Sequence, residues 1–283
     1  QLRNVRSKII IGSKICSSHP KGIGATKLSW IRGGGDNLKF DEINFNEALN
    51  KSLERLKTDY IDLYQLHWPE RNIPIFGNLD YEHDKDEKDW IPIEEILKIK
   101  NKLLKKKFIK NYGLSNESSW GLMKFIYEAK KNNFKKPVSI QNAYNLINRV
   151  FDISLSEISM RENCGLLAYS PLASGRLSGK YLNNKKPKNS RFLLWPGRFD
   201  RHFTKKGEIA IKKYLDLSEK YNLDPILLAH SFVLSRPFVT CSIMGVSNLD
   251  QLKKNLDSIN LAVENEIFEK INLIHNEYRN PCV

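Results

Sequence analysis

The stretch NEALNKSLERLKTDYIDLYQLHWPE (residues 46–70) contains two hydrophobic periods in direct succession. In residues 46–57 the apolar side chains recur at helical spacing, which is typical of an amphipathic helix. Residues 60–68 instead form a short apolar run that ends at His67 and Trp68, as expected for a buried β-strand. The stretch therefore predicts a helix that leads directly into a strand.

The same alternation extends over most of the 283 residues. Buried strands, rich in β-branched residues, are expected at residues 8–15, 60–68, 108–116, 137–144, 164–172 and 238–246. Helix-period segments are expected at residues 46–57, 92–106, 120–132, 155–163 and 224–235. Strands that alternate with helices form βαβ units and a parallel sheet. A (β/α)8 TIM barrel, an α/β fold with a unit of about 30 residues, fits this pattern best.

We expect a single domain over residues 1–283, because no Pro-, Gly- or Ser-rich linker divides the chain. The alternative is a doubly wound sheet, which places a glycine-rich fingerprint between a strand and a helix. The nearest candidate, KGIGATK (residues 21–27), lacks the third glycine and is followed by no clear helix. The barrel is therefore favoured.

The formal net charge of +14 raises the possibility of a nucleic-acid partner. The densest basic run, KIKNKLLKKKFIKN (residues 98–111), has leucines and isoleucines at helical spacing. Its lysines are therefore interpreted as the solvated face of an amphipathic helix. Neither a nucleic-acid module nor a metal site is predicted.

The chain is expected to be soluble and cytoplasmic, without a membrane span. No stretch approaches the roughly 20 consecutive apolar residues that cross a bilayer. The cysteines at positions 16, 164, 241 and 282 form no CxxC pair, so neither a disulfide framework nor a zinc site is indicated. This pattern favours a reducing compartment.

Polar or aromatic residues stand at the end of each predicted strand. They are Lys14, His67 with Trp68, Ser115 with Asn116, Gln141 with Asn142, Tyr169 with Ser170, and Gly245 with Ser247. Active sites of α/β barrels are built at the carboxyl ends of the strands. Any one of these residues could simply mark the point where a strand stops, but the set as a whole predicts an active site.

Two connections after strands are unusually long, residues 69–89 and residues 175–207. In α/β barrels the loops on this side form the active face, so the two insertions could cover a substrate or a cofactor. They could equally be surface insertions, which cost little in stability.

The motifs are similar, in order and spacing, to those of the aldo-keto reductases over almost the whole chain. The motifs are IIIGSKI, SLERLKTDYIDLYQLHWPE, GLSN, SIQNAYN, LAYSPLASGRLSGKY and IMGVSNLDQLKKNLDS. The chain most resembles the subgroup that contains the potassium-channel β subunits and related bacterial reductases. The resemblance implies reduction of a small aldehyde or ketone by NADPH.

The family's catalytic lysine and its carbonyl-orienting histidine match Lys14 and His67, and Trp68 would line the substrate cleft. The resemblance also implies a proton-donating tyrosine and an aspartate that lie before the lysine strand, and no residue before Lys14 can supply them. Tyr60 and Tyr64 lie within the strand before His67 and are not substitutes. We expect either a preceding segment with these residues and two further barrel strands, or a truncated, inactive relative; the first is favoured.

The resemblance implies a nicotinamide-binding half. Ser115, Asn116 and Gln141 would hold the nicotinamide amide, and Tyr169 would stack on the ring. The loop that covers the pyrophosphate with backbone N–H groups would consist of Ser170, Pro171, Leu172, Ala173 and Ser174.

Further residues are implied at the phosphates and the adenosine. Lys180 and Arg191 would add positive charge. A turn and helix start after the last strand would favour a phosphate through Gly245, Ser247, Gln251 and Asn255. Lys254 stands where some relatives have a glutamate, and a free lysine there suits the 2′-phosphate of NADPH.

Two other classes of function stay open. One is a regulatory or partner-binding barrel that binds the nicotinamide cofactor without turnover, as the resemblance to channel β subunits implies. The other, suggested only by charge, is a nucleic-acid binder. A proton-donating tyrosine would distinguish the reductase from the regulatory barrel.

Overall fold

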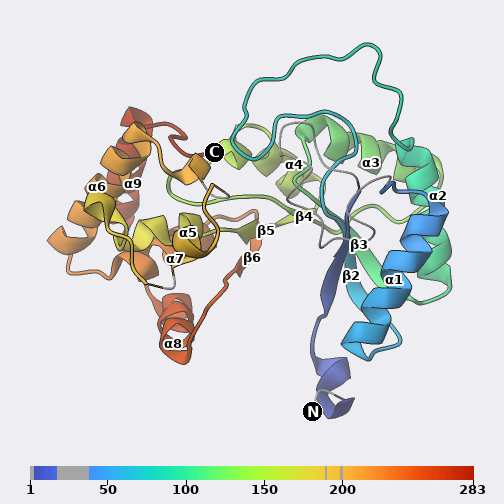
Figure 1. Cartoon of the computed structure of the whole chain (residues 1–283), viewed down its shortest axis with the longest axis horizontal. Coiled ribbons are helices and arrows are strands. Elements are labelled where there is room, and N and C mark those ends of the chain that lie inside the picture. The colour runs from blue at the N-terminus through green and yellow to red at the C-terminus, as the bar shows by residue number, and fades with distance from the viewer. Residues whose placement is uncertain (1–2, 18–37, 189, 198–199) are drawn as a thin grey trace. The chain divides into compact units, whose positions relative to one another are not determined.

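The computed structural model describes residues 3–17, 38–188, 190–197 and 200–283, and the KGIGATK segment lies outside them. The chain divides into two compact units (Figure 1). The N-terminal unit is Gln1–Pro74 with Asp80–Gln141, and the C-terminal unit is Ile75–Leu79 with Asn142–Val283. The expectation of one domain over the whole chain stays a prediction.

Four parallel strands form the sheet of the N-terminal unit, and they are neighbours in chain order. They are β1 (Gly12–Ile15), β2 (Ile61–Leu66), β3 (Ile109–Ser115) and β4 (Ser139–Gln141). A 3-10 helix, Arg3–Lys8, precedes β1. The register places Lys14 of β1 opposite Gln65 of β2. Because the strands are parallel, their carboxyl ends, which carry the predicted site residues, lie at one edge of the sheet.

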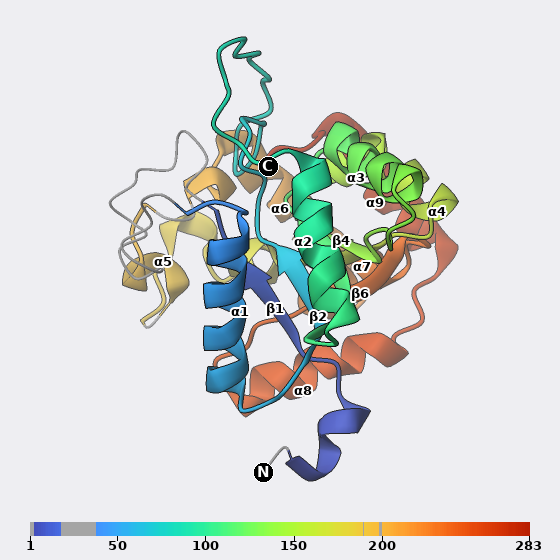
Figure 2. The same ribbon diagram turned by 90° about the vertical axis from the view of Figure 1, so that its right-hand side faces the viewer.

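Three helices cover one face of these strands (Figures 1 and 2). They are α1 (Glu42–Leu56), α2 (Ile93–Lys105) and α3 (Ser119–Lys131). The start of α1 is capped by the Asp41 carboxylate, which accepts a hydrogen bond from the Asn44 amide at 2.8 Å. The Ser118 hydroxyl caps α3 in the same way through the Gly121 amide at 3.2 Å.

The helix α2 corrects one prediction about the lysine-rich segment. Lys98 and Lys102 lie on the exposed face, as predicted, but Lys100 is fully buried. Its ammonium lies 4.6 Å from the ring centre of Tyr112 and 5.4 Å from that of Phe45. Cation–π attraction to these rings offsets part of the cost of burying the charge.

The C-terminal unit contains two parallel strands, β5 (Gly165–Tyr169) and β6 (Val239–Ile243). Its helices are α4 (Leu155–Arg161), the short α5 (Arg191–Leu194), α6 (Lys205–Lys220), α7 (Pro225–Leu234), α8 (Leu249–Asp257) and α9 (Asn265–Glu277). Short 3-10 helices, Val150–Ile153, Ala173–Ser178, Leu182–Asn184, Asp200–His202 and Ser258–Asn260, complete it. An aromatic cluster of Tyr144, Phe151, Phe232 and Phe238 forms the centre of its core.

Every predicted strand and helix is present, with the strands shorter than expected. The prediction that all strands are buried is wrong for β6, whose Thr240 and Cys241 are exposed. A strand pattern alone does not distinguish a central strand from a strand at an edge. The helices α6 and α9 were not predicted from the sequence.

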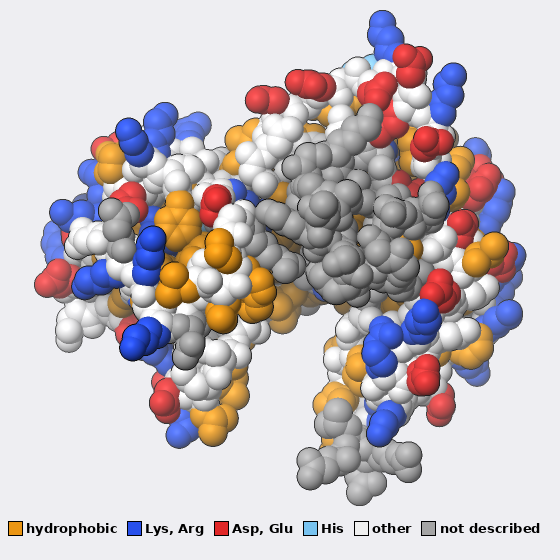
Figure 3. Space-filling model, in the orientation of Figure 1, with side chains coloured by type: hydrophobic (Ala, Val, Ile, Leu, Met, Phe, Trp, Pro, Cys, Tyr) orange, Lys and Arg blue, Asp and Glu red, His pale blue; other side chains and the backbone are white. Residues whose placement is uncertain are grey.

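Charged side chains of both signs share the surface of the described residues. On the face drawn in Figure 3, Lys and Arg side chains are interspersed with Asp and Glu side chains. Several lysines and arginines form exposed ion pairs, among them Lys51–Glu47, Lys98–Glu94 and Arg161–Glu157. In the part of the chain that the structure describes, no helix has the length and apolar character needed to span a membrane.

Candidate active site

Lys14 and His67 lie on adjacent strand ends in the N-terminal unit. Lys14 is in β1, and the amide of His67, which directly follows β2, donates to the Ile15 carbonyl at 2.9 Å. Burial, followed by the positive charge of Lys14, lowers the pKa of His67 to about 4. His67 is therefore neutral at neutral pH, and its imidazole can donate a hydrogen bond from a ring N–H.

Burial also lowers the pKa of Lys14. The loss of hydration makes the ammonium form less favourable, which is the usual effect of burial on a lysine. A carboxylate placed beside Lys14 would act in the opposite direction, because an opposite charge favours the protonated amine. The lysine–aspartate pair that the sequence resemblance implies stays a prediction.

Trp68 packs directly on His67. The two ring centres are 4.3 Å apart with an interplanar angle of 32°. The indole is 6% exposed, so most of its surface contacts the protein. This packing restricts the rotation of the imidazole, and it holds the tryptophan next to the group that would orient a carbonyl.

A buried polar network joins the ends of β2, β3 and β4. The Asn116 side-chain amide donates to the His67 carbonyl oxygen at 2.8 Å and to the Ser115 hydroxyl oxygen at 3.2 Å. The Ser115 hydroxyl donates to the Gln141 carbonyl oxygen at 2.9 Å. The structure therefore brings together three of the predicted nicotinamide-binding residues and the predicted catalytic histidine.

Asn116 has a left-handed backbone conformation, with φ of 53°. Asparagine tolerates this region better than most residues do, and here the conformation directs its side chain back toward the end of β2. Among the described residues, the side-chain amide of Gln141 makes no hydrogen bond, so its donor and acceptor can pair with an amide group of a ligand.

The predicted pyrophosphate loop lies in the C-terminal unit after β5. Ser170, Ala173, Ser174 and Gly175 all have positive φ, and the Ala173 amide donates back to the Ser170 carbonyl oxygen at 2.8 Å. The Gly175 amide likewise donates to the Leu172 carbonyl oxygen at 2.8 Å, so these two amides pair within the loop itself. The predicted role of residues 170–174 at the pyrophosphate stays a prediction.

Tyr169, at the end of β5, has its pKa raised by burial, and a hydrogen bond with Arg201 opposes that rise. Lys180 is exposed, and its ammonium lies 5.1 Å from the ring centre of Tyr181. Arg191 is the first residue of α5, and its side chain lies outside the part that the structure describes. Their predicted contacts with the cofactor stay predictions.

The turn between β6 and α8 holds the last group of predicted residues. The Gln251 side-chain oxygen accepts from the Ser247 amide at 3.0 Å and from the Ser247 hydroxyl at 3.1 Å. Ser247, Gln251 and Gly245 are exposed, whereas Asn255 is buried and lies beside His230. Asn255 therefore does not share the exposed face of the other three.

The prediction of a free lysine at position 254 is wrong. The Lys254 ammonium forms an ion pair with the carboxylate of Asp224, which also caps α7 by accepting from the Ile226 amide at 2.8 Å. Sequence reasoning could not foresee this pair, because the two residues lie on helices separated by β6. The charge of Lys254 is thus partly neutralised within the protein.

Neither tyrosine near His67 in sequence can act as a proton donor at this site. Tyr64 is fully buried in β2, among the aromatic side chains that surround Lys100. Tyr60 lies before β2, at the opposite end of the strand from His67, with the Arg6 guanidinium 3.9 Å from its ring centre. The prediction that they are not substitutes is confirmed.

Two charged residues that sequence reasoning missed follow His67 closely. Glu70 and Arg71 belong to the same turn, and both have buried polar partners in distant segments. Their position directly after HWP was the available signal. Side chains next to a predicted catalytic residue often hold it in place.

Parallel strands with polar residues at their carboxyl ends are typical of an α/β-barrel enzyme. The chain belongs to the Aldo/keto reductase family, whose model matches residues 2–276. The six parallel strands are accordingly part of a (β/α)8 barrel, as the sequence predicted.

Three curated relatives illustrate the similarity. "Protein tas" of Escherichia coli (strain K12) is 36% identical over 98% of this chain and 77% of its own length. An "Aldo-keto reductase" of Babesia bovis is 35% identical over 97% of this chain and 98% of its own length. A "Putative voltage-gated potassium channel subunit beta" of Schizosaccharomyces pombe (strain 972 / ATCC 24843) is 27% identical over 81% of this chain and 63% of its own length.

Proposed function

We propose that the protein reduces a small aldehyde or ketone to an alcohol with NADPH as the hydride donor. The observation that carries this proposal is the arrangement at one sheet edge of Lys14, His67 and the Ser115–Asn116–Gln141 network. Hydride transfer needs a carbonyl held beside the nicotinamide and a hydrogen-bond donor for the oxygen on which charge develops.

In this reaction His67 orients the substrate carbonyl. Its lowered pKa keeps the imidazole neutral at neutral pH. The neutral ring carries one N–H group, which donates to the carbonyl oxygen. A donor aimed at a developing oxyanion contributes about 2.7 to 4 kcal/mol to the transition state. Trp68 packs on the ring and would form one wall of the substrate cleft.

We propose cofactor-binding residues in each unit by itself. When bound, NADPH supplies the hydride. In the N-terminal unit Gln141 has an unused side-chain amide that suits the nicotinamide carboxamide. In the C-terminal unit we propose the amides of Ser170, Leu172 and Ser174 as donors to the pyrophosphate, because the Ala173 amide pairs with the Ser170 carbonyl oxygen and Pro171 has no N–H. Lys180 and Arg191 are proposed to supply positive charge for the 2′-phosphate.

The proton donor is the remaining requirement of the proposed reaction. The tyrosine and aspartate that the resemblance implies are not found before Lys14 in residues 1–283. We therefore expect a polypeptide of these residues alone to reduce a model aldehyde about 10²- to 10⁴-fold more slowly than an enzyme that has the proton donor. Robust aldehyde reduction by that polypeptide would show that another group in residues 1–283 donates the proton.

The choice between NADPH and NADH is tested by titrating both cofactors against single variants. Lys180→Ala and Arg191→Ala should each weaken NADPH binding about tenfold or more, since a hydrogen bond to a charged group contributes roughly 1.5 to 3 kcal/mol. NADH, which lacks the 2′-phosphate, should bind nearly as before.

Lys254→Ala should weaken NADPH less, because Asp224 already pairs with that ammonium. The matched control is Lys98→Ala, which removes a surface charge paired with Glu94 on α2. Equal losses for NADPH and NADH would place Lys180 and Arg191 away from the 2′-phosphate.

The second candidate is a nicotinamide-binding barrel with a regulatory or partner-binding role. It is favoured by the similarity to the putative channel subunit of Schizosaccharomyces pombe. Steady-state turnover of a model aldehyde by the natural full-length protein distinguishes the two candidates. Tight cofactor binding without turnover would favour the regulatory role over the reductase. For either function, the four scattered cysteines favour a reducing compartment such as the cytoplasm.

A further inference from the structure

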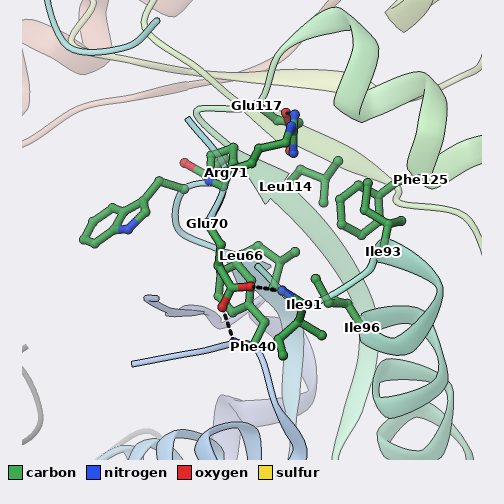
Figure 4. A pocket seen from close by; sticks show the side chains of 13 residues that line it. Phe40, Leu66, Glu70, Arg71, Ile91, Ile93, Ile96, Leu114, Glu117 and Phe125 are labelled. Atoms are coloured by element: carbon green, nitrogen blue, oxygen red, sulfur yellow. Dashed lines mark hydrogen bonds and ion pairs between the residues drawn. The ribbon is translucent and has the colours of Figure 1, made fainter. Parts of the chain in front are cut away.

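Glu70 holds two segments that are distant in sequence. One carboxylate oxygen accepts from the Phe40 amide at 2.5 Å and the other from the Ile91 amide at 2.7 Å (Figure 4). Phe40 directly precedes Asp41, the cap of α1, and Ile91 directly precedes Pro92, the cap of α2. Glu70 therefore fixes the turn after β2 against the residues that lead into both helices.

Arg71, the next residue, holds a third segment. Its guanidinium makes a two-pronged ion pair with Glu117, in which Nη1 donates to Oε2 at 3.1 Å and Nη2 contacts Oε1. Nη2 also donates to the Ser118 hydroxyl at 3.1 Å, and the Trp120 ring centre is 4.8 Å from the guanidinium carbon. The pair thus connects the turn after β2 to the loop after β3.

The surroundings make this connection hard to replace by water. The side chains of Arg71 and Glu117 are only 11% and 4% exposed. Together with Glu70 they line a hollow whose other walls are mostly apolar, including Leu66, Leu114, Ile93, Ile96 and Phe125 (Figure 4). In such surroundings a paired charge is held strongly, and a charge that loses its partner is costly.

Gly121 leaves room for the ion pair. A Cβ atom on Gly121 would lie 2.1 Å from Glu117 Oε1 and 2.2 Å from Arg71 Nη2, so a side chain cannot be added there unless the pair moves. Glycine inside a helix is unfavourable relative to alanine. Its presence in the first turn of α3 is explained by the space that the pair needs.

We propose that Glu70 and Arg71 are positioning residues, which hold the His67–Trp68 turn at a fixed place relative to the Ser115–Asn116 loop. The same two segments are joined on the site side by the hydrogen bond from Asn116 to the His67 carbonyl oxygen. Trp68 and Ser115 line the hollow as well, so Glu70 and Arg71 lie around the same hollow as one predicted substrate residue and one predicted nicotinamide residue. The catalytic meaning of this arrangement rests on the proposed function.

The decisive measurement is an NMR titration of the His67 ring, assigned with His67→Gln. His67 owes its low pKa to burial and to nearby Lys14. If Arg71→Ala or Glu70→Gln loosens the turn, the imidazole gains solvent and moves from Lys14. Its pKa should then rise from about 4 toward the ordinary value, by roughly one unit or more.

Two further variants separate positioning from mere stability. Arg6→Ala is the matched control, because Arg6 and Asp62 form a similarly buried ion pair at the other end of β2, with side chains 15% and 11% exposed. It should lower the melting temperature and leave the His67 titration unchanged. Gly121→Ala keeps both charges but displaces them, and it should reproduce the Arg71→Ala shift.

Kinetics on the natural full-length protein supply the functional readout. Arg71→Ala should lower kcat about 10- to 100-fold per folded molecule, because a displacement of about 1 Å at a reacting group has effects of that size. The charge-swapped double variant Arg71→Glu with Glu117→Arg should recover part of the loss, whereas Glu117→Arg alone should not. Arg6→Ala should leave kcat unchanged.

The outcomes are distinct. A His67 titration in Arg71→Ala and Gly121→Ala that matches the wild type would overturn the proposal, even if both variants melt earlier. If the wild-type protein reduces no carbonyl compound, the proposed function fails, but the His67 titration still decides whether Glu70 and Arg71 hold the turn.

Discussion

The side-chain amide of Asn116 donates to the main-chain carbonyl oxygen of His67 across 2.8 Å, although the two residues follow different strands. Each strand of a parallel sheet brings its carboxyl end to the same edge, so a short polar side chain on one end reaches the backbone of the next. The position of the predicted catalytic histidine is therefore coupled to that of a predicted nicotinamide ligand.

The loss of stability on substituting Asn116 should depend on how well the new residue tolerates the left-handed backbone conformation at this position. Asn116→Ala loses the buried hydrogen bond and must also adopt φ near 53°, whereas Asn116→Gly loses only the hydrogen bond. The left-handed conformation is unfavourable for alanine, so we expect Asn116→Ala to lower the free energy of unfolding by about 1 kcal/mol more than Asn116→Gly. Urea unfolding of the two variants measures the difference, and equal midpoints would contradict it.

His67→Ala, tested in the natural full-length protein, should lower kcat far more than it changes cofactor affinity. The expected loss is about 2.7 to 4 kcal/mol of transition-state stabilisation, the size seen when one oxyanion donor is removed. A typical point substitution lowers stability by about 1 kcal/mol and leaves turnover per folded molecule nearly unchanged. Single-turnover hydride transfer and thermal melting on the same variant separate a loss of catalysis from a loss of stability. An unchanged transfer rate would show that His67 has no catalytic role.

Lys100 should make the stability of the protein depend on pH above neutrality. Burial lowers its pKa from 10.5 to about 7. Between these values the unfolded chain binds a proton that the folded chain does not, so the free energy of unfolding rises as the pH increases from 7 to 10.5. Lys100→Met should stabilise the protein by on the order of 2 kcal/mol at pH 7 and by much less near pH 10.5.

The control for Lys100 is Lys98→Met on the same helix, at a site where the lysine is exposed and paired with Glu94. Surface changes of that kind shift stability by at most about 0.5 kcal/mol. Denaturant titrations at several pH values test both variants. A Lys100→Met advantage that does not shrink with rising pH would mean that the lysine is charged when folded.

His230 should contribute to acid sensitivity. It is fully buried in α7, and burial lowers its pKa from 6.5 to about 4. As the pH falls from 6.5 to 4, the unfolded state takes up a proton that the folded state does not, so stability is lost in that window. His230→Gln should remove on the order of 2 kcal/mol of this pH dependence. The control is His83→Gln at an exposed position, which should leave the pH dependence of the free energy of unfolding unchanged. If this pH dependence is the same in the wild type, His230→Gln and His83→Gln, the prediction for His230 is wrong.

The architecture could be predicted because it depends on local periodicity. Alternating apolar runs and helical stripes define where strands and helices begin to form, and parallel pairing then brings the strand ends to one edge. Lys14, His67, Ser115, Asn116 and Gln141 were all found by reading those ends, and the structure places them at one edge of one unit.

The helical period of α2 also predicts the burial of Lys100, although we expected this lysine to be exposed. Lys100 occupies the buried stripe of α2, four residues after Ile96 and three after Leu97, so its burial followed from spacing. Its residue type argued for solvent instead. The aromatic rings of Phe45 and Tyr112 that accept its ammonium come from other elements, and no local pattern identifies them.

What the sequence determined by itself was the order of the strands and of most helices, the family and the polar residues at the strand ends, because each depends on neighbours along the chain. The tertiary structure alone decided which charges distant in sequence are paired. Lys254 meets Asp224, and Arg71 meets Glu117 from a segment 46 residues away. Such pairs depend on the distance between side chains in space, and that distance is set only once the strands and helices have packed.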